Sequence, residues 1–113
     1  MKHLTVEGKT LIVGDAVADA LTEYAAVIAR TQSGDTVDVH AITDTGDETV
    51  ATIVFTSATS IIAETVSSTR REPGNEKATA YLRERIDSVM SPPMMAVPES
   101  PDERAWSTEL EDS

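Results

Sequence analysis

The sequence predicts a small single domain of the α+β class: an antiparallel sheet of four to five strands with two helices on one face, in the order ββαββ(β)α. Three observations lead to this prediction. The chain has 113 residues, which is room for one domain. Several short segments alternate apolar and polar residues and are joined by short turns, as in antiparallel hairpins. Two longer segments carry apolar residues every three or four positions, as amphipathic helices do.

The first two strands lie in the stretch HLTVEGKTLIV, residues 3–13. The pair Glu7 and Gly8 separates them, and glycine supplies the positive φ that a two-residue hairpin turn needs. Within each of the two strands, alternate apolar residues mark the face expected to be buried: Leu4, Val6, Leu11 and Val13.

The first helix is expected over residues 16–31. Asp15 follows Gly14 and is a good N-cap residue. Gly34 in the following QSGD is placed where a helix C-terminus favours a left-handed residue. An apolar stripe with spacings of four, three and four runs along the segment: Val17, Leu21, Tyr24 and Ile28.

Two strands and a turn follow the first helix. The stretch TVDVHAI at residues 36–42 and the stretch TVATIVF at residues 49–55 alternate, and TDTGDE between them is typical of a turn. A further strand is expected within SIIAETV, residues 60–66, with uncertain bounds. The side chains expected to face inward are Val37, Val39, Ala41, Ala51, Ile53 and Phe55, with Asp38 and His40 outward.

The second helix is expected to begin with Asn75 as its cap and to end near Met90. The prolines of SPPMMAVPESP cannot continue a helix, because they lack an amide donor and fix φ. The domain is therefore predicted to span residues 1–90, and residues 91–113 are predicted to be a Pro/Met-rich linker and an acidic tail. The residues of this helix expected to face inward are Ala78, Leu82, Ile86, Val89 and Met90.

The tail is predicted to contain a short docking helix at residues 101–111. Ser100 and Glu103 can form a capping box, and Pro101 suits the first helical position. So short a helix is marginal in water unless its apolar side chains are buried. The receiving surface can be the protein's own core, another protein or a second copy of the chain, and tail disorder without a partner is the remaining alternative. The predicted partner-binding residues are Met94, Met95, Val97, Trp106 and Leu110.

The composition limits the possible partners. Twenty acidic residues against nine basic ones give a formal net charge of −11, which repels nucleic acids and anionic membranes. The acidity itself fits solubility, a high-salt cytoplasm or mimicry of nucleic acid. The chain has no cysteine, and its two histidines, His3 and His40, fall on separate predicted strands. No cofactor or metal site is expected, and without a signal-like apolar stretch a cytoplasmic protein is expected.

The stretch AITDTGDETV at residues 41–50 resembles the Asp-Thr-Gly loop of retroviral-type aspartic proteases. The resemblance implies that Asp44, Thr45 and Gly46 of two subunits would bring two carboxylates together. Two features depart from the family pattern: Asp47 stands where a small residue is usual, and the later apolar-apolar-Gly segment is missing. Asp, Thr and Gly are also the residues that a polar hairpin turn needs, and the turn is the preferred interpretation.

The sequence thus favours a non-enzymatic protein-interaction module, an adaptor or a self-associating homodimer, that uses the C-terminal docking helix. An acidic inhibitor of the antitoxin, immunity or anti-defence type, covering a basic partner surface, is the alternative. A homodimeric aspartic protease acting through Asp44 is the remote one.

Overall fold

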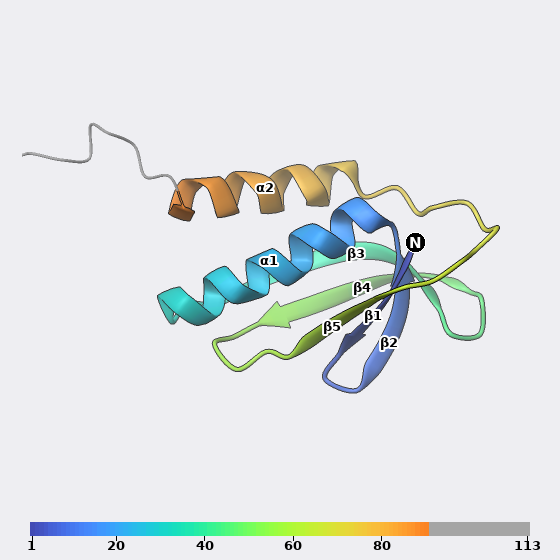
Figure 1. Ribbon diagram of the computed structural model, residues 1–113, viewed down its shortest axis with the longest axis horizontal. Coiled ribbons are helices and arrows are strands. Elements are labelled where there is room, and N and C mark those ends of the chain that lie inside the picture. Colours follow the sequence, from blue (N-terminus) through green and yellow to red (C-terminus); the bar gives the residue numbers. More distant parts are fainter. Residues whose placement is uncertain (91–113) are drawn as a thin grey trace, which may run out of the picture.

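The computed structural model describes residues 1–90 and confirms the predicted α+β fold. Five strands and two helices follow one another in the predicted order (Figure 1). They are β1 (Lys2–Val6), β2 (Lys9–Val13), α1 (Asp15–Thr31), β3 (Asp35–Thr43), β4 (Glu48–Phe55), β5 (Ile61–Thr65) and α2 (Glu76–Met90).

The strands form one antiparallel sheet in the order β4-β3-β2-β1-β5. Both helices lie over the same side of it, α1 against the sheet and α2 alongside α1 (Figure 1). The core lies between α1 and the sheet, and its two aromatic rings, Tyr24 of α1 and Phe55 of β4, meet edge to face with centroids 5.3 Å apart. The inward residues predicted for the four main strands are buried or half-buried, so the predicted alternation is confirmed.

The β1–β2 hairpin turns through Glu7 and Gly8, as predicted. Both residues have positive φ, 50° and 85° respectively. Positive φ at both central positions is the type I′ geometry, whose twist matches that of the flanking strands. The turn sets the register, in which Val6 lies opposite Lys9.

β4 and β5 lie at opposite edges of the sheet although only residues 56–60 join them. So short a link reaches at most about 20 Å, hardly more than the width of a flat sheet of this strand number. The sheet is therefore strongly curled, and in Figure 1 β1 and β2 cross the direction of β4 steeply.

The ends of α1 differ from the prediction. Gly14, not Asp15, is the N-cap residue, and no side chain caps the helix there. Asp15 is the first helical residue, and its Oδ1 lies 3.0 Å from the amino group of Met1. At the other end Gln32, rather than Gly34, takes the left-handed conformation, with φ 54°. The helix ends at Thr31, three residues before the glycine, and the Gln32 and Ser33 amides both donate to Ile28 O.

Asn75 precedes α2, but its side chain does not cap the helix. Its Oδ1 accepts from the His40 amide and its Nδ2 donates to the His40 carbonyl, each at 2.8 Å. β2 pairs with β3 only at Leu11 and Ile12, because the chain leaves the sheet after Val13 to start α1. The carboxamide, which has a donor and an acceptor like a peptide group, takes the place that β2 leaves empty beside His40.

The inward face of α2 is narrower than predicted. Leu82 and Ile86 are buried, but Val89 is 40% exposed. The helix packs chiefly against α1, and its main contact with the sheet is with β3. A single neighbouring helix covers only a narrow strip, which explains the exposure of Val89.

Candidate functional site

β4 is an edge strand with one side unpaired. The Thr43 amide donates to Asp47 O at 2.8 Å, so the hydrogen-bonded pairs between β3 and β4 are those of odd-numbered residues. The backbone groups of Val50, Thr52 and Val54 consequently point away from β3. No other described strand pairs with this side of β4, and only Val54 O receives a side-chain donor, the Thr59 hydroxyl at 3.4 Å.

The edge of β4 lacks the features that usually protect such strands. Natural edge strands are short or carry charges, prolines or bulges that prevent pairing with another chain. β4 has eight residues, and those after Glu48 are uncharged and contain no proline. Val50 and Val54 are 57% and 61% exposed on the sheet face opposite the helices. Among residues 1–90, nothing keeps another extended segment from pairing with this side of β4.

A groove of about 450 Å³ lies along β4. Residues 49–54 form one wall, and the β1–β2 hairpin forms the other through Val6, Glu7, Lys9 and Leu11. Leu11 and Ile53 are buried in the core, whereas Val6 and Ala51 are only half-buried. The groove thus offers apolar side chains next to unpaired backbone groups, the combination that binds a peptide by strand addition.

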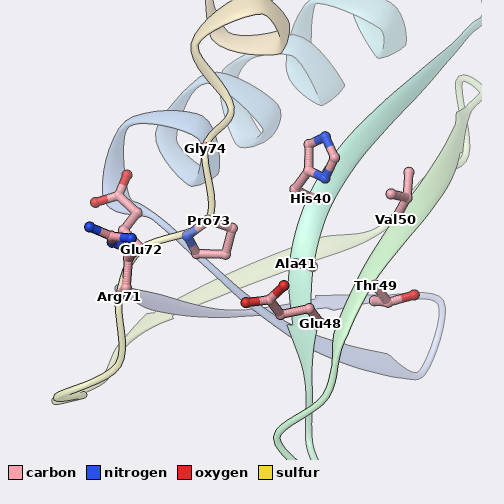
Figure 2. A pocket seen from close by; sticks show the side chains of 9 residues that line it. All are labelled: His40, Ala41, Glu48, Thr49, Val50, Arg71, Glu72, Pro73 and Gly74. Carbon is pink, nitrogen blue, oxygen red and sulfur yellow. The ribbon is translucent and has the colours of Figure 1, made fainter.

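A second hollow, of about 440 Å³, lies where β3 and β4 meet residues 71–74 (Figure 2). In Figure 2 the Pro73 ring points toward β3, and the Glu48 side chain extends across β3 toward it. The bonds between Asn75 and His40 hold this segment against the sheet. Val50 lines both hollows, so the exposed part of β4 joins them into one continuous surface.

A polar cluster of Tyr24, Asp35 and Tyr81 ties α1, β3 and α2 together. Asp35 Oδ2 accepts a hydrogen bond from each tyrosine hydroxyl at 2.5 Å. Burial raises the pKa of Asp35, but the two tyrosine hydrogen bonds, the Thr36 amide and the charge of Arg85 together outweigh it and hold the pKa below its usual value. The bond to Asp35 raises the pKa of Tyr81 to about 12, and burial together with the same carboxylate raises the pKa of Tyr24. The cluster joins three elements of the fold, and each of its hydroxyls already has a partner.

Asp44, Thr45 and Gly46 form the turn between β3 and β4. Gly46 has a φ of 95°, and its amide donates to Thr43 O at 3.0 Å. The Thr45 hydroxyl donates to Asp47 Oδ2 at 3.2 Å, and the Asp47 amide donates to Thr43 Oγ1 at 3.1 Å. The Asp44 side chain is exposed at the tip. The three residues thus have the turn geometry that their types favour, although the structure does not test the protease hypothesis.

The structure does not test the other predicted site residues. Met94, Met95, Val97, Trp106 and Leu110 lie outside the described residues. Within residues 1–90 no group of three or more His, Asp or Glu side chains is placed to hold a metal ion. The open edge of β4 was missed at the sequence level. The one feature of the sequence that indicates this edge is the run of uncharged residues in TVATIVF, and a central strand can have the same feature.

Comparisons with known proteins add no family to this description. No family model, no curated protein and no solved structure matches the chain. In the described part of the chain, neither helix is long and apolar enough to cross a membrane.

Proposed function

We propose that the protein is a small non-enzymatic interaction module that binds an extended segment of another polypeptide along β4. One observation carries the proposal: an uncharged edge strand of eight residues with an unpaired side borders an apolar groove. A segment added there would pair with the backbone of Val50, Thr52 and Val54 and would cover Val6 and Ala51. Backbone pairing would supply affinity, and the groove would select the side chains.

The C-terminal tail is the second binding element of this proposal. Trp106 and Leu110 would dock as a short helix on the same partner or on this domain, as their spacing predicts. The two elements together would make the protein an adaptor. The tail would also raise the effective concentration of any partner that engages both.

A library of displayed peptides, selected on the full chain, tests the proposal. We expect enriched peptides to be extended and largely uncharged, and to shift the amide resonances of Val50, Thr52 and Val54. Thr52→Pro removes one edge amide and no backbone hydrogen bond to β3, so it should abolish the binding. It also removes the bond from the Thr52 hydroxyl to Asp38 Oδ1 on β3. The matched control is Ile62→Lys on β5, which changes an equally exposed side chain at the other edge.

Two outcomes would contradict the proposal. Failure of every peptide to bind, or equal binding to wild type and Thr52→Pro, would remove β4 from consideration. Binding only by basic peptides, lost as the salt concentration rises, would favour the acidic inhibitor instead.

A further inference from the structure

We infer that the polypeptide that pairs with β4 is the β4 strand of a second copy of this chain, so that two five-stranded sheets join into one of ten strands. The inference rests on the proposed function and names its partner. Three observations support it. Two copies of β4 can pair in a register that suits their side chains, the paired residues carry no charge, and β4 lacks the charges, prolines and bulges that usually prevent edge strands from pairing.

The register is restricted by the backbone. Only even-numbered residues of β4 point their amides and carbonyls away from β3, so a second β4 must pair with them through its own even-numbered residues. In an antiparallel dimer with a two-fold axis at Thr52, Val50 of one copy lies opposite Val54 of the other, and Thr52 lies opposite itself. Each of these residue pairs can exchange two backbone hydrogen bonds.

The side chains suit this register on both faces of the sheet. On the outer face, each exposed valine of one copy meets an exposed valine of the other, which removes the exposed valines of β4 from water. On the inner face, Ala51 lies opposite Ile53 of the other copy. Shifting the axis to Val50 would instead place Glu48 opposite Thr52 and leave Val54 beyond the end of the partner strand.

The charge distribution also favours the edge over a broad face. Two copies that each carry −11 repel one another, so a large face-to-face interface is opposed by electrostatics. The residues of β4 after Glu48 are uncharged, and Glu48 lies outside the paired stretch centred on Thr52. A strand-to-strand contact therefore brings the copies together where like charges are sparsest.

Sedimentation of the full chain over a range of concentrations tests the inference. We expect a reversible monomer–dimer equilibrium whose dissociation constant is at least ten-fold weaker in Thr52→Pro and unchanged in Ile62→Lys. Circular dichroism and thermal unfolding of each variant establish that it is folded. Amide hydrogen exchange of Val50, Thr52 and Val54 should slow as the protein concentration rises.

Charge variants test the register. The double variant Val50→Lys/Val54→Lys places like charges opposite each other in the dimer, as does Val50→Glu/Val54→Glu, so each should be monomeric alone. Mixed together, they should associate, because positions 50 and 54 of the two chains then carry opposite charges. Failure of the mixture to associate would overturn the axis at Thr52.

The inference and the proposed function fail in different ways. A wild-type chain that stays monomeric at all concentrations while displayed peptides still bind at β4 would overturn the second copy as partner and leave the module intact. A dimer that survives Thr52→Pro would place the interface elsewhere, with the tail as the next surface to truncate. A wild-type chain that neither binds displayed peptides nor dimerises would overturn both.

Discussion

The side-chain amide of Asn75 completes the backbone hydrogen bonding of His40, with both bonds at 2.8 Å. Through this pair, the segment before α2 is attached to β3 at the point where β2 ends. Asn75→Ala would leave a partly buried amide and carbonyl without partners. We expect it to lower the free energy of unfolding by about 2 kcal/mol, as measured by urea denaturation.

Two substitutions sharpen the Asn75 prediction. Asn75→Asp keeps the acceptor but sets a carboxylate against the His40 carbonyl, so its destabilisation should shrink as acid protonates the new carboxyl. Glu76→Ala, at the exposed neighbouring position, is the control and should change stability little. If the Asn75→Ala variant were as stable as the wild type, water would be replacing the side-chain amide without loss, and the prediction would be wrong.

Gly14 is close to the side chain of Glu72. A Cβ added at Gly14 would come 1.9 Å from Glu72 Oε2 and 2.3 Å from its Cδ, although the backbone, at φ −68° and ψ 161°, accepts any residue. Gly14→Ala should nevertheless change the free energy of unfolding by less than about 0.5 kcal/mol, because Glu72 is exposed and its flexible side chain can turn away. In a double-mutant cycle with Glu72→Ala the two effects should then be additive. A much larger loss of stability in Gly14→Ala, relieved by Glu72→Ala, would contradict this expectation.

Because of the Tyr24–Asp35–Tyr81 cluster, we expect the free energy of unfolding to depend on pH in both the acidic and the alkaline range. The lowered pKa of Asp35 means that its contribution to stability is complete above the unfolded value of about 3.9 and is lost as pH falls through the folded pKa. The pKa of Tyr81, raised to about 12, means a contribution complete below about 10 and lost as pH rises through 12.

Tyrosinate absorbance measures the second effect. In Asp35→Asn the Tyr81 hydroxyl should titrate closer to the ordinary value of about 10. Tyr81→Phe identifies which transition belongs to this residue. A wild-type Tyr81 that already titrates at about 10 would contradict the hydrogen bond to Asp35.

Trp106 reports on the tail because it is the only tryptophan in the chain. If the tail docks, the indole emission should be blue-shifted and poorly quenched, and Trp106→Ala should cost a few kcal/mol, roughly 2–4, at the receiving surface. Docking within one chain gives shielding at every concentration. Docking to a second copy gives shielding that fades on dilution. An indole exposed at all concentrations would refute docking within the chain or onto a second copy.

Asp44→Asn is expected to change stability by less than about 0.5 kcal/mol, since Asp44 is an exposed residue at a turn tip. The hydrogen bonds of the turn come from its neighbours Thr43, Thr45 and Asp47. Peptide cleavage at acidic pH is the second measurement. Activity present in wild type and absent in Asp44→Asn would establish the protease hypothesis and end the non-enzymatic one.

Local patterns predicted the elements of this fold well. Alternation along residues 36–42 and 49–55 identified β3 and β4 and their inward faces, and the Glu7 and Gly8 pair identified the first hairpin. These features depend on neighbouring residues only. Asn75 directly precedes α2, as predicted, and its carbonyl accepts from the Thr79 amide, but its side chain bonds to His40 instead of capping the helix. The cap predicted at Asp15 was wrong: Asp15 is the first residue of α1 and pairs with the Met1 amine.

The strand order, and with it the candidate site, could not be predicted. Nothing within TVATIVF distinguishes an edge strand from a central one, because both can be apolar on two faces. β4 is an edge strand only because β5 pairs with β1 rather than with β4, the strand that precedes β5 in the sequence. That choice depends on contacts distant along the chain.

The pairing of β5 with β1 sets an order of events during synthesis. β1 leaves the ribosome before the other strands of the sheet, yet one of its two neighbours is available only when residues 61–65 emerge. Until then the nascent chain has two unpaired edges, on β1 and on β4, and pairing distant strands is slow. Arrival of β5 closes the β1 edge and leaves β4 as the longer open one. A translational pause that holds residues 61–65 inside the ribosome after β4 has emerged would therefore prolong the state most prone to aggregation.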